Sequence, residues 1–179
     1  MKILVIVAHP SMEQSRANRA LIQELNLHEN IDVHSLYGEY SDWNIDIERE
    51  QQLVSKYDRI VLQFPLFWYS TPPLLKKWFD DVLTYGWAYG SEGDHLKGKE
   101  FIVATTAGGS EQDYRSSGNF EFTVSEFLRP IQVTVQYTGA IYLPAFIVHD
   151  AMEATDEQLK LEAHRYVEHI RASTEVLLS

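Results

Sequence analysis

The sequence of 179 residues predicts one doubly wound α/β domain, in which helices cover both faces of an open parallel sheet. Short apolar, β-branched runs alternate five times with amphipathic stretches, which is typical of repeated strand–helix units. The chain is too short to divide into two halves with adequate cores, and it has no linker or internal repeat. We therefore expect a single domain over residues 1–179.

The first strand is expected over residues 2–8, because a continuous apolar run is typical of a strand covered on both faces. A helix should follow over 15–27, where apolar residues recur at helical spacing. The short alternation over 31–36 is flanked by polar residues and predicts an edge strand. A second helix, over 47–56, precedes a buried strand over 59–64.

Prolines and glycines divide the rest of the chain into elements. Pro65 ends the preceding strand because proline cannot donate to a central ladder, and a helix should run from Pro72 to about Tyr85. After a long loop, the expected elements are a strand over 101–106, a helix near 120–128, a strand over 132–143 and a last helix over 156–178.

The composition limits the partners. A net charge of −11 and a pI near 5.0 oppose binding to nucleic acid and to anionic membranes, both of which favour basic surfaces. The absence of cysteine removes thiolate ligands, and no histidine pair has a convincing ligand spacing, so no metal site is expected. No apolar run has the length of a membrane span or the form of a signal peptide. These features fit a cytoplasmic protein.

Three segments follow the ends of predicted buried strands, and ligands of open parallel sheets bind beyond those ends. The first is residues 9–18, which lead into a helix whose N-terminal N–H groups and partial positive charge suit a phosphate. Ser15 and Asn18 add side-chain donors, and Arg16 adds charge. The alternative is that Ser15 only caps the helix.

The second segment, residues 63–73, carries Phe67, Trp68 and Tyr69 in one short loop. Three adjacent aromatic side chains cannot all face the core from a loop, so some should contact a partner or a flat heteroaromatic ligand. The alternative is that they pack against a second subunit or against Trp78.

The third segment, residues 105–114, contains Gly108 and Gly109, which let the backbone approach a ligand closely and adopt positive φ. Tyr114 follows them and can donate a hydrogen bond to a carbonyl acceptor. The alternative for this segment is a plain turn. His149 and Asp150 are interpreted as a strand-end turn rather than a catalytic pair.

Four motifs together resemble the flavodoxin-like NAD(P)H:quinone oxidoreductases over nearly the whole chain. They are H-P-x4-S-x-A-N at 9–18, F-P-L-x-W-Y-S-x-P-P-x-L-K-x-W at 64–78, G-W-A-Y-G at 86–90 and T-T-x-G-G-S at 105–110. The motif at 64–78 is highly specific, whereas the glycine motif alone is not. The short bacterial members are the most similar, and they include ancillary oxidoreductase subunits of glutathione-gated potassium efflux systems.

The resemblance implies a flavodoxin-like sheet of five strands in the order 2-1-3-4-5, a bound flavin, and ping-pong hydride transfer from NAD(P)H to a quinone or a similar acceptor. It implies that the flavin phosphate is held by His9, Ser15, Arg16, Ala17 and Asn18. It also implies that the flavin ring is lined by Pro65, Leu66, Phe67, Trp68, Tyr69, Thr106, Ala107, Gly108 and Gly109.

Tyr114 matches the position of a tyrosine that helps stabilise the reduced flavin in the larger quinone reductases, so it is the predicted catalytic residue. Those enzymes have a histidine a few residues later, whereas residues 115–120 of this chain contain none. The larger members bind FAD and have a longer C-terminal region, so FMN is the expected cofactor here. Homodimers are common in the family and would explain surface aromatic residues such as Trp43, Trp68 and Trp87.

The leading function is therefore a flavin-dependent NAD(P)H oxidoreductase. The alternative is a regulatory ancillary subunit of a glutathione-gated potassium efflux transporter, with weak or secondary enzymatic activity, held at the inner membrane through that partner. A third function, a one-electron carrier of the flavodoxin type, is less favoured because direct reaction with NADPH would need no separate reductase.

Overall fold

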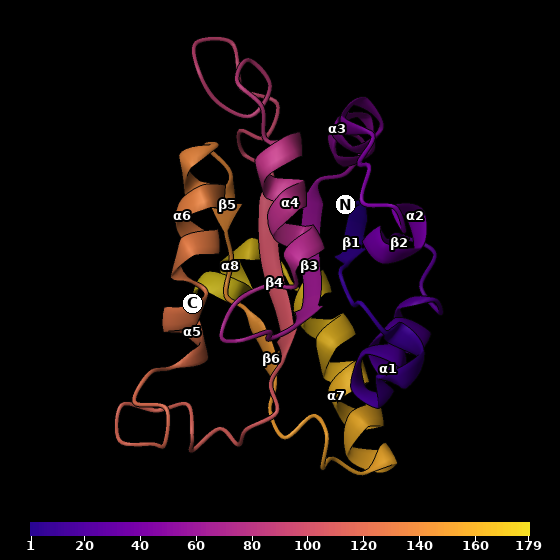
Figure 1. The fold of residues 1–179 in the computed structure, drawn as a ribbon, viewed down its shortest axis with the longest axis vertical. Coiled ribbons are helices and arrows are strands. Elements are labelled where there is room, and N and C mark those ends of the chain that lie inside the picture. The colour runs from indigo at the N-terminus through magenta and orange to yellow at the C-terminus, as the bar shows by residue number, and fades with distance from the viewer.

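The computed structural model covers residues 1–179 and is built on a parallel sheet with the strand order β2-β1-β3-β4-β5, in which β6 also pairs with β4 (Figure 1). The strands are β1 (Ile3–Val7), β2 (Ile31–Ser35), β3 (Arg59–Pro65), β4 (Glu100–Thr106), β5 (Ile141–Tyr142) and β6 (Phe146–Val148). The predicted flavodoxin-like order is confirmed, with β2 at one edge of the sheet.

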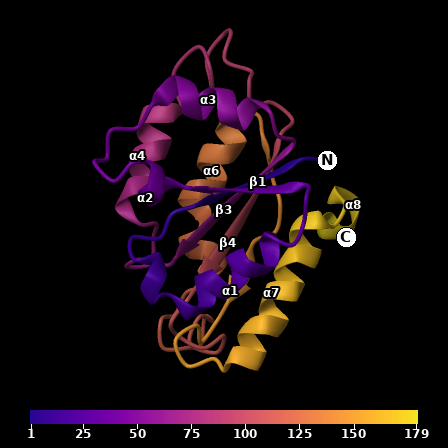
Figure 2. The same cartoon turned by 90° about the vertical axis from the view of Figure 1, so that its right-hand side faces the viewer.

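Helices cover both faces of the sheet (Figure 2). On one face, α1 (Arg16–Leu25) and α7 (Asp156–Arg171) lie side by side. The core on the other face is closed by α2 (Leu36–Glu39), α3 (Ile47–Ser55), α4 (Pro73–Val82), α5 (Val124–Phe127) and α6 (Arg129–Tyr137). A 3-10 turn, η1 (Met12–Gln14), precedes α1, and α8 (Thr174–Leu178) ends the chain. None of these helices combines the length and apolar composition that crossing a bilayer requires.

Side-chain alternation places β1 between two cores. Leu4 and Ile6 enter the core beneath α4, whereas Val5 and Val7 enter the core beneath α1 and α7. All residues of β1 are buried. The strand therefore has no solvent-facing position, which explains why its sequence is apolar throughout.

The prediction of a strand over 132–143 is wrong, because residues 129–137 form helix α6. Pro130 suits the first turn of this helix, and Ile131 and Val135, four residues apart, are both buried against the core. Packing at helical spacing therefore overrides the strand preference of the β-branched residues. The predicted helix near 120–128 is correspondingly reduced to the short α5.

Two short strands fill the fifth position of the sheet. β5 pairs with Glu100 and Phe101 of β4, and β6 pairs with Ala104–Thr106 of the same strand. Pro144 lies between β5 and β6 and cannot donate a backbone hydrogen bond, which explains the interruption of the ladder. This interrupted strand forms the sheet edge opposite β2.

The predicted last helix is divided into α7 and α8. At the end of α7, the carbonyls of Ile170 and Ala172 accept hydrogen bonds of 2.6 and 2.8 Å from Nη1 of the buried Arg59. The Arg59 guanidinium also pairs with the Glu100 carboxylate at 2.6 Å. The end of α7 is thus fixed to the start of β3.

A buried carboxylate joins β2 to the helices on one face. Glu50 of α3 is fully buried, and its carboxylate accepts hydrogen bonds from His34 Nε2 (2.8 Å), the Tyr40 hydroxyl (2.7 Å) and Trp78 Nε1 (2.8 Å). Burial alone would raise the pKa of Glu50. The hydrogen bonds from His34 and Tyr40, with smaller contributions from the His34 charge and Trp78, outweigh burial and lower the pKa below its ordinary value of 4.5.

Because the pKa of Glu50 is lower in the folded than in the unfolded chain, its ionisation stabilises the fold above about pH 4.5 and this contribution is lost as the pH falls further. We expect Glu50→Gln to lower the free energy of unfolding at pH 7 by about 1.5–3 kcal/mol and to reduce the loss of stability on acidification. Urea unfolding at pH 7 and at about pH 4 measures both effects. The exposed Glu48→Gln in the same helix is the control, and an equal response of the two variants would contradict this assignment.

Candidate functional site

The three segments predicted to form a site meet at the carboxyl end of the sheet, where they line a cleft of about 580 Å³. This end lies at the bottom of the sheet in Figure 1. The lining residues are His9, Ser11, Gln14, Ser15, Arg16, Ala17, Asn18, Pro65, Leu66, Phe67, Thr106, Ala107, Gly108, Ala151 and Met152. Ala151 and Met152, which follow β6, were missed by the sequence analysis.

The N-terminus of α1 forms one end of the cleft. Ser15 is the N-cap, and its Oγ accepts a hydrogen bond of 3.2 Å from the Asn18 N–H. The N–H groups of Arg16 and Ala17 have no helical acceptors, because the first N–H groups of a helix have no preceding turn to bond. Capping by Ser15 and anion binding at these N–H groups are therefore compatible roles.

Arg16 and His9 add further donors at this end. Arg16 Nη2 pairs with Asp156 Oδ1 at 2.6 Å, but both side chains are exposed, so the pair is weak and easily exchanged for another anion. His9 Nδ1 accepts a hydrogen bond of 3.1 Å from the Ser11 N–H, which places the proton of the neutral ring on Nε2. Burial lowers the pKa of His9, although the charge of Glu13 opposes this shift, so the ring is neutral at pH 7.

Hydrogen bonds among buried polar side chains hold together the elements that line the cleft. Asn18 Nδ2 donates to Ser15 Oγ and to Thr106 Oγ1, each at 3.1 Å. Asn18 Oδ1 accepts from Gln63 Nε2 at 3.2 Å, and Gln63 Oε1 accepts from the Tyr166 hydroxyl at 3.1 Å. This buried polar chain, Tyr166–Gln63–Asn18–Thr106, links α7, β3, α1 and β4.

Gln63 lies in the second predicted segment but was not predicted as a site residue, and Tyr166 lies outside all three segments. A signal for Gln63 was present, because it is the one polar residue in the apolar run 60–64. A polar side chain in a strand covered on both faces must find partners within the core. The sequence offers no comparable signal for Tyr166, which lies 103 positions from Gln63.

Residues 67–70 form a tight turn with uncommon backbone angles. Phe67 and Ser70 exchange two backbone hydrogen bonds of 2.8 Å, and Trp68 and Tyr69 between them have φ of 45° and 61°. Positive φ at both central residues is type I′ geometry, which favours asparagine and glycine and is costly for bulky side chains. Strain of this kind is found most often at functional segments.

This turn separates the three aromatic rings. Phe67 lines the cleft, whereas Trp68 projects into solvent with 92% of its surface exposed. Tyr69 packs against Phe127, with ring centroids 5.1 Å apart. Of the five residues predicted in this loop, the structure thus brings Pro65, Leu66 and Phe67 to the cleft and leaves Trp68 and Tyr69 outside its lining.

Of the two glycines, Gly108 lines the opposite wall of the cleft and Gly109 lies outside the lining. A Cβ on Gly108 would have no heavy atom within 4 Å, so this position faces open space. A Cβ on Gly109 would lie 3.0 Å from the Phe120 ring and 3.1 Å from the Tyr114 ring. Neither glycine has positive φ, so that expectation is wrong, and Gly109 is required by close packing instead.

Tyr114 lies behind the glycine loop and outside the cleft lining. It is 8% exposed, and its ring centroid is 4.7 Å from that of Phe120. Burial raises the pKa of Tyr114, although a hydrogen bond with the Gly109 backbone opposes the shift, so its hydroxyl is protonated at neutral pH. The ring of His149, just after β6, lies 5.7 Å from that of Tyr114. A histidine is therefore close to Tyr114 in space, although none follows it closely in sequence.

A doubly wound sheet in this order, with a helix N-terminus and a cleft at the point where the strand order reverses, defines a flavodoxin-like α/β protein. The chain belongs to a protein family with a flavodoxin-like fold. The model of this family matches residues 1–170. The family predicted from the four sequence motifs is thereby confirmed.

Two curated relatives match almost the entire chain. The chain is 48% identical over 172 residues to YrkL of Bacillus subtilis, named an uncharacterised NAD(P)H oxidoreductase, and the match covers 96% of this chain and 99% of YrkL. It is 41% identical over 174 residues to KefF of Salmonella typhi, named a glutathione-regulated potassium-efflux system ancillary protein, covering 97% of this chain and 98% of KefF.

Two solved structures have closely similar folds. General stress protein 14 of Treponema denticola, in complex with FMN, has a TM-score of 0.92 and 40% identity, covering 95% of this chain and 98% of that chain. An NADPH-quinone reductase from P. pentosaceus has a TM-score of 0.88 and 31% identity, covering 97% of this chain and 99% of that chain.

We expect Asn18→Ala to lower the free energy of unfolding by about 1–3 kcal/mol, because it removes the side-chain hydrogen bonds of Asn18 with Gln63 Nε2 and Thr106 Oγ1 in a buried position. Asn30→Ala, at an exposed position, should change it by less than about 0.5 kcal/mol. Urea unfolding of both variants measures the difference. Equal effects of the two substitutions would show that the buried polar chain contributes little.

Proposed function

We propose that this protein is an FMN-dependent NAD(P)H oxidoreductase that reduces a quinone or a similar acceptor. The observation that carries the proposal is the cleft, which joins an anion site at the N-terminus of α1 to apolar walls from the loops after β3 and β4. A phosphorylated planar ring needs both of these at once. The names of YrkL and of the quinone reductase, and the FMN in the stress protein, support the same assignment.

The cleft fits FMN at its phosphate end. The N–H groups of Arg16 and Ala17, the Ser15 hydroxyl and the neutral His9 Nε2–H would donate to a phosphate, and the Arg16 guanidinium would exchange Asp156 for it. Asn18 would not bind the phosphate through its side chain, because its amide is already bonded to Ser15, Thr106 and Gln63. It would instead hold Ser15 in position. The volume of about 580 Å³ also suits a ligand of this size.

The other end of the cleft fits a flat ring. Leu66 and Phe67 form one wall, and Ala107 and Gly108 form the other. Open space beside Gly108 would let the ring approach the backbone. We assign Thr106 and Gly109 to the support of this wall, and Trp68 and Tyr69 to the rim of the ring site, where the turn presents Trp68 to solvent.

Bound FMN would supply the hydride chemistry, accepting a hydride from NAD(P)H and passing it to the second substrate. The chain would orient the ring, exclude water from its buried side and balance its charge. We assign to the protonated Tyr114 hydroxyl the role of a hydrogen-bond donor that balances negative charge at the ring's carbonyl edge. Tyr114 does not line the cleft, but it packs against Gly109, next to the lining residue Gly108, which supports a role at the edge of the ring site.

Exposed aromatic residues support a homodimer. Trp68 is 92% exposed and Trp43 is 42% exposed. Trp87 was expected on the same surface, but it is buried and stacks on His95, so that expectation is wrong. A second copy that covers Trp68 would also cover the rim of the ring site.

The second candidate function is that of an ancillary subunit of a potassium efflux transporter. The 41% identity to KefF over almost the whole chain favours it. The two functions are compatible in one protein, because a transporter would contact the outer surface and leave the cleft free. Turnover with NADPH and quinone, compared with recovery of a transporter from native membranes, distinguishes the oxidoreductase from a purely regulatory subunit.

We expect the protein reconstituted with FMN to be yellow, to lose its absorbance near 450 nm on anaerobic addition of NADPH, and to regain it on addition of a quinone. Stopped-flow absorbance measures both half-reactions. If the protein binds FMN but NADPH does not reduce it, the oxidoreductase function is excluded, and the protein is an electron carrier or a regulatory subunit. Failure to bind any flavin after reconstitution would contradict the proposed function.

Gly108→Val tests where the ring binds. The new side chain enters open space, so the free energy of unfolding should hardly change, but it should weaken FMN binding by tenfold or more because it occupies the ring site. Gly108→Ala is the matched control and should have a smaller effect. Fluorescence quenching of FMN measures the affinities, and unchanged binding in Gly108→Val would place the ring elsewhere.

A further inference from the structure

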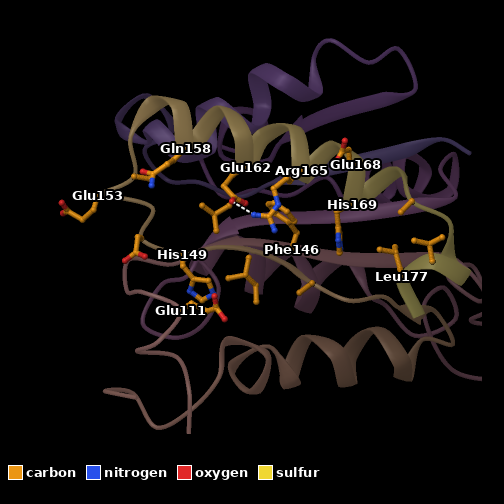
Figure 3. Close-up of a pocket in the computed structure, with 17 residues that line it drawn as sticks. Glu111, Phe146, His149, Glu153, Gln158, Glu162, Arg165, Glu168, His169 and Leu177 are labelled. Carbon is orange, nitrogen blue, oxygen red and sulfur yellow. Dashed lines mark hydrogen bonds and ion pairs between the residues drawn. The ribbon is translucent and has the colours of Figure 1, made fainter. Parts of the chain in front are cut away.

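A second hollow, which shares no lining residue with the cleft, runs along the edge of the sheet between β6 and α7 (Figure 3). This edge groove has a volume of about 970 Å³. Glu111 and Glu153 lie at one end of it and Leu177 of α8 at the other. The proposed oxidoreductase function makes no use of it.

The groove follows an unpaired strand edge. β6 pairs with β4 alone, and the Val148 carbonyl accepts a hydrogen bond of 2.8 Å from the Ala107 N–H. Because the backbone polar groups of consecutive strand residues point to opposite sides, the N–H and C=O of Ile147 point away from β4, and Ile147 is among the residues that line the groove. Extended peptides bind such edges by adding a strand.

The floor of the groove is apolar and held in place. The Phe146 ring lies 5.2 Å from the Tyr166 ring and 5.6 Å from the His169 ring. His169 Nε2 is bonded to the Pro144 carbonyl at 2.8 Å, just before β6. A strand edge fixed in this way needs little reorganisation to accept a partner, which lowers the cost of binding.

The rim of the groove is strongly acidic. The acidic residues of its lining are Glu111, Asp150, Glu153, Glu162 and Glu168. The one cationic side chain besides the histidines, Arg165, is paired with Glu162 at 2.7 Å. Figure 3 shows His149 beside Glu111 at one end, and the Nδ1 of His149 is buried without a hydrogen-bond partner. The groove therefore offers acceptors and negative charge to a cationic partner.

We infer that the edge groove binds an extended, lysine- or arginine-rich peptide segment of another protein, which adds as a strand to β6. Backbone groups of Ile147 would pair with the segment, its apolar side chains would contact the floor, and its cations would meet the carboxylates. A second copy of this chain is the poorer occupant of this groove, because symmetric pairing of two β6 edges would bring the acidic linings of both copies together.

The test uses a fluorescein-labelled, acetylated hexapeptide of alternating lysine and valine, with binding measured by fluorescence anisotropy. A glutamate–valine peptide of the same length should not bind. Two N-methylated forms of the lysine peptide, blocked at odd or at even positions, test strand addition. One form should lose at least about tenfold in affinity and the other little, because only alternate N–H groups face the strand edge.

The double variant E153K/E168K should weaken binding of the lysine peptide by about tenfold or more, because both residues belong to the groove lining and the change reverses two of its negative charges. The control E29K/E92K changes the net charge equally at exposed positions outside the groove, and should change affinity by less than about twofold. Urea unfolding of each variant checks its stability, and E153K alone replaces a double variant that fails to fold.

Three outcomes would overturn the inference. They are no binding of the lysine peptide at millimolar concentration, equal losses from both methylation patterns, and equal losses in the groove and control variants. A shift in oligomeric state of E153K/E168K, measured by sedimentation velocity, would instead assign the groove to a second copy of the chain.

Discussion

The hydrogen-bonded chain from Tyr166 through Gln63 and Asn18 to Thr106 is the interaction on which the cleft depends. Its members belong to four elements that are far apart in sequence, and all of them are buried. A buried amide that loses its partner costs about 1–3 kcal/mol, so α1, β3, β4 and α7 cannot shift independently at this end of the sheet. The N-terminus of α1, with its free N–H groups, is thereby held at a fixed distance from the loops that form the two walls.

This fixed frame also explains how the strained turn at 67–70 persists. Left-handed backbone at Trp68 and Tyr69 costs about 1–3 kcal/mol per residue. The turn is held on one side by the hydrogen bond of 2.8 Å from the Leu66 N–H to the Thr106 carbonyl, and on the other by packing of Tyr69 on Phe127. Thr106 thus serves both the buried polar chain and the aromatic wall of the cleft, which couples the two ends of the proposed flavin site.

Much of the fold could be predicted because the signals are local. Burial on both faces makes β1 and β3 apolar, and Ser15 caps α1. The region 120–148 could not be predicted correctly, because the helix over 129–137 depends on tertiary packing, whereas its β-branched residues locally favour a strand. For the site, the positions of the strand ends predicted which three loops would meet. The sequence did not reveal that Trp68 and Tyr69 would turn away from the cleft. Nor did it reveal that the last quarter of the chain would supply Tyr166 to the buried polar chain and Met152 to the cleft lining.

A crystal structure of the protein with FMN bound would locate the flavin directly. We expect phosphate oxygens within hydrogen-bond distance of the Arg16 and Ala17 N–H groups, and the ring between Phe67 and Gly108, with the buried polar chain intact. Electron density for FMN in the groove along β6, or in any place that leaves the N-terminus of α1 without contact, would contradict the proposed flavin site.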